Sequence, residues 1–557
     1  MKVSRARGNT IATVTRGLLA SALIVASCAR TGTVGLVEGE SETGIGTSTG
    51  DQPDDGRDDG TLLDLPDDPI DVCTARSDQM GVGMCTQTSV ADAFEPAIQW
   101  EWTGPDGDVD TRVIPLVANL DDDDGNGMVD LCDRPDVVVV AGPAPANPMN
   151  EAPPPARIYA LDGATGSQHW RTEQSVRAMI TPALADIDRD GEIEIVTLQA
   201  DGERQGRLVP SRLVAFSAAG TLEWTSGTTF LAPSSGAVAI ADLDLDEDAE
   251  IMIANRVFDH LGAPVFEATD VGEMAGYALM PVAVDLDNDD DLEVLWSRAA
   301  YHHDGTLLWS NPDVRSGLVH VANLNDDPAP EIIVTTDGGI MLLQPDGTPF
   351  ADRFKPADLP DSEETWRRPA AIHDVDEDRQ REILLSAGDV FFAVRVDPDA
   401  GELDVLVEFP VQDPLGFSAG TAFDFLGDGS AEAMYADENE LHVYEPMNAI
   451  AAFTAARSSV TVEEYPVVAD VDNDGSAEIV IGSNTTVTAS DPTVRVIGDA
   501  ANRWVQSRRI WNQHTYHVTN IGENGQLPTP EPHHWERTNT FRTNVQIEGG
   551  IICLPEP

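Results

Sequence analysis

The sequence predicts an all-β protein built from repeats of one four-stranded unit. Three observations support this prediction. A run of alternating acidic residues recurs along the chain, each copy is followed at once by an apolar run rich in β-branched residues, and no long stretch has the periodicity of an amphipathic helix. Repeated four-stranded units limit exposed sheet edges when they close in a ring. We therefore expect a β-propeller of about eight, alternatively seven, four-stranded blades with Ca²⁺-binding loops.

The clearest copy of the acidic run is Asp470, Asp472, Asp474, Gly475 and Glu478, followed by the apolar run EIVIG. Carboxylates at alternate positions of a tight turn supply the oxygen ligands that Ca²⁺ prefers, and glycine permits the sharp turn. Without a cation the clustered carboxylates would repel one another. The pattern therefore predicts a cation loop that fixes the turn between two strands. A Ca²⁺ that bridges to a bound ligand is the alternative.

Copies of the run start near residues 119, 186, 242, 285, 323, 374, 424 and 470. Leu426 stands where the seventh copy should have its second carboxylate, and Glu247, Asp290 and Arg379 replace the glycine in three others. The predicted metal ligands are Asp122, Asp124, Asn126, Asp130, Asp186, Asp188, Asp190, Glu194, Asp242, Asp244, Asp246, Glu250, Asp285, Asp287, Asp289, Glu293, Asn323, Asn325, Asp327, Glu331, Asp374, Asp376, Asp378, Glu382, Asp424, Asp428, Glu432, Asp470, Asp472, Asp474 and Glu478.

The first copy is expanded, so a set that begins at Asp122 fits the spacing as well as one that begins at Asn119. If this irregular unit is an insertion, seven blades remain. Ahead of it, the segment IQWEW at residues 98–102 could pair with the last unit and close the ring. Between the loops, Asp-Gly and Ala-Gly turns flanked by apolar runs predict β-hairpins.

With these loops, the chain resembles FG-GAP or VCBS repeat proteins, which are related in fold to the propeller of integrin alpha subunits. The resemblance covers about residues 110–500 and rests on the loop spacing and on the strand that follows each loop. The literal Phe-Gly and Gly-Ala-Pro signatures do not recur in register. The resemblance implies a Ca²⁺-binding propeller over residues 111–502 and a lipoprotein of bacterial type.

The N-terminal region predicts an exported, lipid-anchored protein. Residues 1–27 begin with basic residues and continue into the apolar run LLASALIVAS, as in a lipoprotein signal peptide. The sequence VASC resembles a bacterial lipobox, so we expect lipidation of Cys28 and attachment to the outer membrane or cell surface of a bacterium. Ordinary signal cleavage beside an incidental cysteine is the alternative. Residues 28–70 are acidic and poor in apolar residues, which predicts a disordered tether.

Four cysteines remain: Cys73, Cys85, Cys132 and Cys553. In an exported chain they predict two disulfides, with three possible pairings. Cys73 with Cys85 is the local choice, and Cys132 with Cys553 would then tie the first repeat to the C-terminus. We expect residues 71–110 to be a cysteine-containing lead-in with the ring-closing strand.

The formal net charge of −64 restricts the partners of this protein. Such a surface repels nucleic acid and anionic lipids. We therefore expect no nucleic-acid partner, and a monomer whose membrane contact runs through its lipid.

The C-terminal segment, residues 503–557, is rich in Arg, His and aromatic residues. Arginine and aromatic residues dominate binding hot spots. One interpretation is a ligand site, and the other is a structural cap that packs across the propeller and pairs its arginines with loop carboxylates. The candidate ligand-binding residues are Trp504, Arg508, Trp511, His514, His517, Trp535 and Arg542.

Our first hypothesis for the function is a non-catalytic adhesion or ligand-binding module for protein or carbohydrate. The second is a Ca²⁺-dependent polysaccharide lyase, because some lyases are similar eight-bladed propellers; this is analogy of fold alone. A third rests on the segments at residues 161–170 and 304–309, which resemble turns of quinone-dependent dehydrogenase or assembly-scaffold propellers. Tryptophans that dock between blades would explain the same segments. The sequence contains no Ser-His-Asp, phosphate-loop or dinucleotide fingerprint, and no catalytic residue is assigned.

Overall fold

The computed structural model describes residues 73, 82–89, 94–146, 152–200, 208–272, 279–325, 327–355, 368–413, 418–484 and 491–554. The expected signal peptide, the lipidation site at Cys28 and the expected tether lie outside the described residues. These three remain predictions.

The described residues form an all-β structure, as the sequence predicts. Their one α-helix is the single turn α1 (His534–Arg537), and two short 3-10 turns cover Pro105–Gly107 and Pro446–Asn448. Within the described ranges, no helix is long and apolar enough to cross a membrane.

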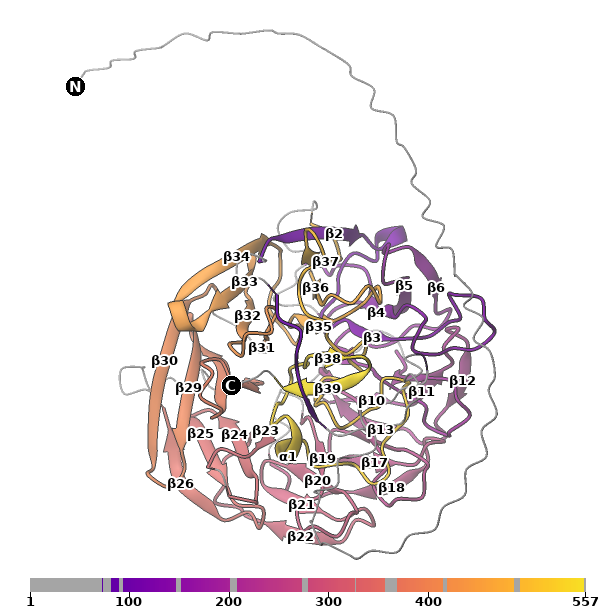
Figure 1. Ribbon diagram of the computed structural model, residues 1–557. Helices are drawn as coiled ribbons and strands as arrows, with labels where there is room; N and C mark the ends of the chain where they lie inside the picture. Colours follow the sequence, from indigo (N-terminus) through magenta and orange to yellow (C-terminus); the bar gives the residue numbers. More distant parts are fainter. Residues whose placement is uncertain are drawn as a thin grey trace, which may run out of the picture. The chain divides into compact units, whose positions relative to one another are not determined.

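Eight four-stranded sheets make up most of the described structure, and Figure 1 shows them arranged around a common centre. The first three contain β3 (Leu116–Ala118), β4 (Asp136–Ala141), β5 (Arg157–Asp162) and β6 (Gln168–Arg171); β8 (Ala183–Ala185), β9 (Glu194–Leu198), β11 (Leu213–Phe216) and β12 (Leu222–Thr225); and β15 (Ala239–Ala241), β16 (Glu250–Ile253), β17 (Arg256–Phe258) and β18 (Pro264–Glu267).

The fourth to seventh sheets repeat the same antiparallel order. They contain β19 (Val282–Val284), β20 (Glu293–Trp296), β21 (Ala299–Tyr301) and β22 (Leu307–Ser310); β23 (Gly317–Ala322), β24 (Glu331–Thr336), β25 (Gly339–Leu343) and β26 (Pro349–Phe354); β27 (Ala371–His373), β28 (Glu382–Ala387), β29 (Val390–Asp397) and β30 (Glu402–Pro410); and β31 (Gly420–Phe423), β32 (Glu432–Ala436), β33 (Glu440–Glu445) and β34 (Ile450–Ala456).

The eighth sheet joins the two ends of the repeat region. Its strands β35 (Val467–Ala469), β36 (Glu478–Gly482) and β37 (Val494–Asp499) come from the last repeat, and β2 (Pro96–Trp102) comes from the lead-in. β2 pairs antiparallel with β37, with Trp102 opposite Val494. The expected pairing of residues 98–102 with the last unit is therefore present.

Three smaller sheets complete the described strands. β1 (Gly83–Met84) pairs in parallel with β39 (Ile551–Leu554), which also pairs with β38 (Ile547–Glu548). β10 (Leu208–Ser211) pairs with β13 (Phe230–Pro233), and β7 (Ile180–Thr181) pairs with β14 (Gly236–Ala237).

The four strands of a sheet differ in burial, and their sequences differ accordingly. Inner strands such as β4, DVVVVA, and β28, EILLSA, are buried at every residue. Both of their faces pack on neighbouring sheets, which favours continuous apolar runs over alternation. Outer strands such as β6, QHWR, are largely exposed. The core is thus a set of apolar layers between sheets.

Aromatic side chains of outer strands pack on hairpin glycines of the next sheet. A Cβ added at Gly220 would clash with the Trp170 ring, and one at Gly166 with the Trp100 ring. Trp100 Nε1 also donates to the Gly163 carbonyl at 2.6 Å. The same contact recurs between Trp224 and Gly262, Phe266 and Gly305, and Trp309 and Gly347. Docking between sheets therefore explains the turn-and-tryptophan segments.

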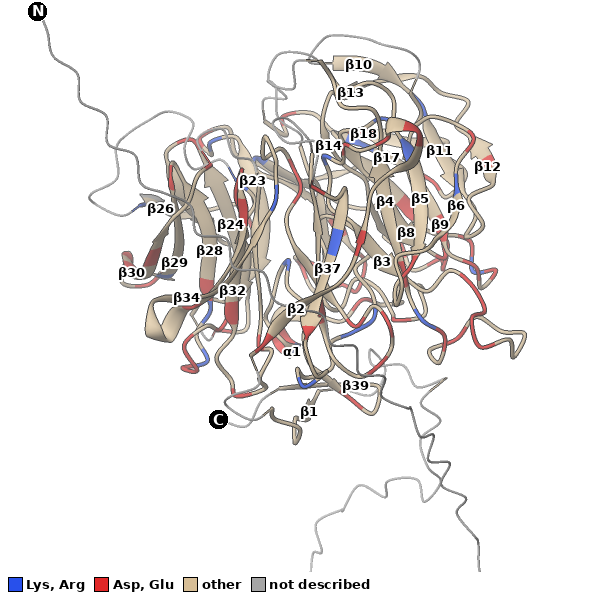
Figure 2. Ribbon diagram, turned by 90° about the horizontal axis from the view of Figure 1, so that it is seen from above, with Lys and Arg blue, Asp and Glu red and all other residues tan. Residues whose placement is uncertain are grey.

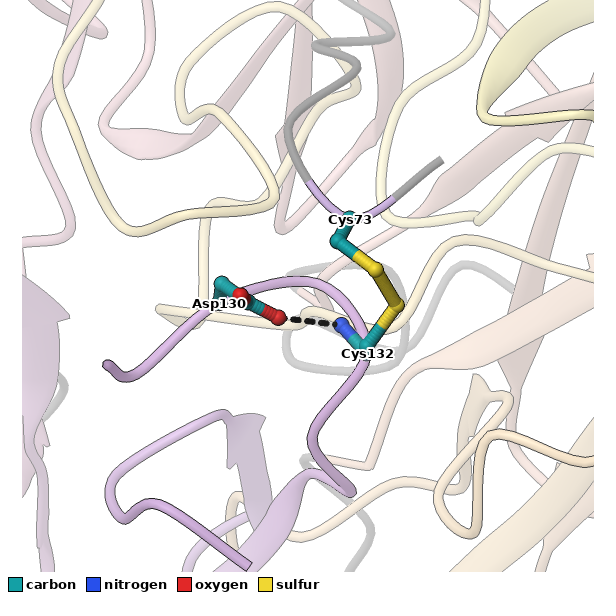
Figure 3. A group of neighbouring side chains, drawn as sticks. All are labelled: Cys73, Asp130 and Cys132. Carbon is teal, nitrogen blue, oxygen red and sulfur yellow. Dashed lines mark hydrogen bonds between the residues drawn. A yellow bond between two sulfur atoms is a disulfide. The ribbon is translucent and has the colours of Figure 1, made fainter. Parts of the chain in front are cut away.

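Two disulfides hold the lead-in, with a pairing that differs from the local choice. Cys73 bonds to Cys132, and Cys85 bonds to Cys553. The expected pairs, Cys73 with Cys85 and Cys132 with Cys553, are wrong, because the lead-in passes both the expanded first loop and β39. Figure 3 shows the Cys73–Cys132 bond beside Asp130, which accepts a hydrogen bond from the Cys132 backbone N–H at 2.8 Å.

The central segment, residues 503–546, lies in the middle of the sheets in Figure 1 and contacts each of them. It has almost no regular structure, yet residues 504–523 are nearly all buried. Its contacts follow the chain order of the sheets and join Trp511 to Val117, Asn512 to Leu184, Gln513 to Ile240, His533 to Asp285, His534 to Val321, Phe541 to Ile372, Arg542 to Thr421 and Asn544 to Val468.

The docking of tryptophan on glycine gives a first prediction. Gly220→Ala should lower stability by about 1–3 kcal/mol more than Gly401→Ala, because overpacking adds to the cost of a left-handed backbone. Gly401 is the matched control: it has a similar φ, +70° against +72°, and nothing near its missing Cβ. Urea denaturation of both variants measures the difference. Equal losses would contradict this account of the contact.

Candidate functional site

The acidic loops join the first strand of each four-stranded sheet to the second, and we number them one to eight in chain order. Figure 2 shows acidic residues in loops on the side of the sheets where α1 and β39 lie. In loops two to eight the conserved spacing places a glutamate at the start of the second strand. Its Oε2 accepts the backbone N–H of the loop's second residue, at 2.7–3.1 Å. The glutamates are Glu194, Glu250, Glu293, Glu331, Glu382, Glu432 and Glu478.

Other carboxylates in these loops accept hydrogen bonds from backbone N–H groups of the same loop. In loops two to four and six to eight, the first aspartate accepts the N–H of the sixth residue, as Asp470 does from Gly475 at 3.2 Å. In these loops the sixth residue has a positive φ whether it is glycine or not: +89° at Gly475, +77° at Glu247 and +75° at Asp290. Loops three, four and six therefore keep the same turn without the glycine, at a cost in backbone strain.

Burial gives the loop carboxylates unusual proton affinities. Burial, together with nearby carboxylates, raises the pKa of Glu194 and Glu250 to about 8. The same causes raise the pKa of Glu331 to about 7 and that of Asp470 to about 7. A buried anion next to other anions is unfavourable, so these groups gain from either a proton or a bound cation.

Besides loop one, which is described below, three loops hold a carboxylate oxygen with no hydrogen-bond partner among the described residues. These buried oxygens are Oδ1 of Asp186 in loop two, of Asp242 in loop three and of Asp472 in loop eight. Each lies in a cluster of acidic side chains whose donors are oxygens, the type that Ca²⁺ prefers. Loops two, three and eight therefore fit a hard cation best.

Loop six already contains a cation from the protein itself. The Arg395 guanidinium lies 2.9 Å from Asp376 Oδ2, 2.9 Å from Asp378 Oδ2 and 2.7 Å from Glu382 Oε1. Arg381 adds a contact to Asp374 Oδ2 at 3.3 Å. A guanidinium fills the space that a metal ion would need. We therefore do not retain loop six as a metal site.

In loops four, five and seven, side chains other than carboxylates take part in the loop. In loop four, His302 Nδ1 lies 2.9 Å from Glu293 Oε1, so an imidazole joins the carboxylates Asp285, Asp287 and Asp289. In loop five, Asn325 Nδ2 donates to Asp327 Oδ2 at 3.3 Å.

In loop seven, Asp424 and Glu432 are buried, and Leu426 leaves the position of the missing carboxylate apolar. Burial raises the pKa of Asp424 to about 7.

The register of loop one is the set that begins at Asn119. The Leu120 N–H donates to Asp136 Oδ2 at 3.2 Å, so Asp136 at the start of β4 does what the glutamate does elsewhere. The sequence analysis missed Asp136, because an insertion separates it from Asn119. The set from Asp122 to Asp130 forms a turn of its own, in which Asp122 accepts the N–H groups of residues 125, 126 and 127. Its members therefore cannot share one site with the repeat.

The candidate ligand-binding residues of the C-terminal segment lie in the interior of the described structure. Trp504, Arg508, Trp511, His514, His517, Trp535 and Arg542 are all buried, at most 7% exposed. The structural alternative accounts for this burial, and two of the segment's arginines, Arg508 and Arg509, bind groups within the segment. Arg509 pairs with Glu523 at 3.1 Å and Arg508 donates to backbone carbonyls. The composition of the segment reflects a polar core, and composition alone cannot separate that from a binding surface.

A cavity of about 390 Å³ lies between loops six and seven, the central segment and β39. Arg379, Asp374, Asp424 and Asp428 supply charged groups, and apolar side chains of β1, β31 and β39 form other parts of the wall. His373 also lines it, and burial lowers the pKa of this imidazole to about 4. The cavity therefore combines a neutral base with cationic and anionic groups.

Comparison with known proteins supports the fold. No protein-family model and no curated protein sequence matches the chain. The V. cholerae biofilm matrix protein Bap1 is similar in structure, with a TM-score of 0.63 and 18% identity over 83% of this chain and 100% of that chain. The exotype rhamnogalacturonan lyase YesX gives a TM-score of 0.50 and 16% identity over 84% of each chain. At these identities the likeness concerns the fold, which is all-β and propeller-like.

The raised proton affinities give a second prediction. Glu194 and Glu250 have an ordinary pKa of 4.5 and a folded-state pKa of about 8. The metal-free folded protein therefore holds protons that the unfolded chain has released, and its stability falls as pH rises from 4.5 toward about 8. Melting curves in chelator measure this loss, and excess Ca²⁺ should reduce it. A melting temperature that rises over this window in chelator would contradict the prediction.

Proposed function

We propose that this protein is a Ca²⁺-binding β-propeller of eight blades that acts as a non-catalytic binding module at a bacterial surface, of the FG-GAP or VCBS type. Each four-stranded sheet is one blade. The signal sequence and Cys28 would place it on the outside of the cell, held by a lipid. The single observation that carries the proposal is the loop arrangement: seven loops share the hydrogen bond from the second residue to the glutamate, and three of them retain a buried carboxylate oxygen with no partner among the described residues.

Two contacts support closure into a ring of eight. β2 completes the eighth sheet, and its Trp100 packs on Gly166 of the first sheet, just as Trp170 of the first sheet packs on Gly220 of the second. The central segment supports the same arrangement. Asn544, which contacts the eighth sheet, also donates to the carbonyl of Ile510 at 3.4 Å, next to the residue that contacts the first.

Calcium would have a structural role: it would stabilise the blades and would take no part in catalysis. Loops two, three and eight would supply Asp and Glu oxygens, with no imidazole or guanidinium among them. Binding to the folded state alone adds RT ln(1 + [Ca²⁺]/Kd) per site, about 1.4 kcal/mol at tenfold excess. Several sites together would then decide whether the sheets stay packed in a protein exposed to external divalent ions.

The cavity between loops six and seven is the surface that we assign to a protein or carbohydrate ligand. The cavity lies on the side of the sheets that carries the acidic loops. Its wall combines charged groups with apolar side chains, as in sites where a few polar groups hold a ligand on an apolar surface. The likeness to a biofilm matrix protein is consistent with an adhesion role, although it concerns fold.

The lyase hypothesis keeps one specific observation in its favour. His373, kept neutral by burial, lines the same cavity as Arg379 and Arg381. A lyase needs a base and positive charge that converge on an acidic sugar. Incubation with acidic polysaccharides tests this: an unsaturated product that appears with the wild type and is lost in His373→Ala would favour the enzyme over the binding module.

The guanidinium in loop six gives a third prediction. Arg395→Gln should lower stability in chelator by about 3 kcal/mol, because it leaves three partly buried carboxylates unpaired, and should add one Ca²⁺ per chain. Arg315→Gln is the control, since Arg315 is half exposed and pairs with Asp337 at the surface at 2.9 Å, so its loss costs under about 1 kcal/mol. Equilibrium dialysis measures the number of bound Ca²⁺ ions, and melting curves measure the change in stability. An unchanged Ca²⁺ count would contradict the role given to Arg395.

The cavity gives a fourth prediction. Arg379→Ala should weaken binding of an acidic glycan about tenfold, by loss of one charge-assisted contact worth about 1.5 kcal/mol or more. A panel of immobilised acidic and neutral glycans, with Ca²⁺ present, measures the change. Arg212→Ala is the matched control, because Arg212 is exposed and does not line the cavity. Equal binding by both variants would remove the cavity as the ligand site.

A further inference from the structure

Loop one holds a cluster of side chains that differs in chemistry from the oxygen-only loops. His169 on β6 lies over the start of the loop, with its Nδ1 2.8 Å from Asp121 Oδ2 and 3.6 Å from Asp136 Oδ1. One donor atom from each of Asp121, Asp136 and His169 can be chosen so that all three lie within 4.8 Å of one another. They come from three places: the loop itself, β4 and β6.

A second observation on this cluster is that a buried oxygen of Asp136 has no hydrogen-bond partner within the described structure. The residue is 1% exposed, and its Oδ2 is used by the Leu120 N–H. Its Oδ1 is buried, accepts no hydrogen bond within the described structure, and faces the imidazole. Asn119 Oδ1 at the head of the same loop is also buried without a partner. An unpartnered buried carboxylate oxygen is costly unless something binds it.

The geometry of the imidazole fits metal binding through Nδ1. Nε2, the other ring nitrogen, faces Asp162 Oδ2 at 3.8 Å. At this distance Asp162 acts on the ring through its charge, which makes the imidazole a stronger ligand, and it is too far for a hydrogen bond. Arg134 also contacts Asp162, at 3.3 Å, so this outer carboxylate is fixed and partly neutralised.

We propose that Asn119, Asp121, Asp136 and His169 form a site for a divalent transition metal such as Zn²⁺. A nitrogen ligand joined to carboxylates suits Zn²⁺ and similar ions, whereas Ca²⁺ takes oxygen ligands. Loop two shows the contrast: the corresponding residue on β12 is Glu223, an oxygen donor. The site does not depend on Ca²⁺ in the other loops, so it can stand if the proposed function fails.

The test measures Zn²⁺ binding to the full exported chain with Ca²⁺ in large excess. We expect the wild type to bind Zn²⁺ and His169→Gln to bind that ion at least about tenfold more weakly. Co²⁺ in place of Zn²⁺ adds a readout of the nitrogen ligand, because its visible absorption should change in His169→Gln. Asp121→Asn, at a partly exposed position, gives a second variant if the first is unstable.

Two control variants leave His169 in place and remove a different histidine. His260→Gln removes a histidine that contacts the single carboxylate of Asp248, at 3.4 Å, and His302→Gln removes the imidazole of loop four. Both variants should bind Zn²⁺ as the wild type does at the loop-one site. The proposal is overturned if Ca²⁺ displaces all Zn²⁺, if His169→Gln binds Zn²⁺ like the wild type, or if His302→Gln loses the tight site instead.

Discussion

Residues 503–546 supply hydrogen bonds to all eight four-stranded sheets, and the packing of the sheets depends on that contact. The first strand of each sheet points its polar backbone groups and loop toward the middle, where a hole would leave them unpaired. Trp511, Phe541 and their neighbours fill the space, and backbone pairs such as Val117 with Trp511, at 3.0 and 2.8 Å, satisfy the polar groups. The disulfide between Cys85 and Cys553 ties β39, which follows this segment, to the lead-in.

The acidic loops lie close to the central segment, and the negative charge of each loop is balanced in a different way. In loop six the cation is Arg395, in loops one and four an imidazole contacts the loop carboxylates, and in loops two, three and eight a buried carboxylate oxygen has no hydrogen-bond partner among the described residues. The segment takes part, since Gln506 donates to Asp470 and Thr529 donates to Asp242. Under the proposed function, one repeated turn would therefore serve either as a structural ion pair or as a metal site, depending on one side chain from a neighbouring strand.

The repeat spacing predicted the strands after the loops, because a strand that follows a turn depends on local pattern. The pairing of residues 98–102 with the last unit joins distant segments, and it was predicted from the position of that segment ahead of the first loop. The first loop was ambiguous because Asp136 lies beyond an insertion, and the disulfide pairs were wrong because they depend on which distant segments meet. For C-terminal residues such as Arg508 and His514, the sequence leaves both the ligand site and the structural cap open, because a buried polar core has the same composition as a binding surface. Arg395 could have been found by aligning the third strands and asking which one places a cation over the loop.

Hydrogen exchange of the intact protein tests the role of the central segment most directly. Backbone amides of residues 504–523 and 541–546 should exchange as slowly as those of β4 and β28, although most of them lie outside regular strands, because they open only when the sheets separate. Exchange of these amides within the dead time of the experiment, while β4 and β28 stay protected, would contradict the account.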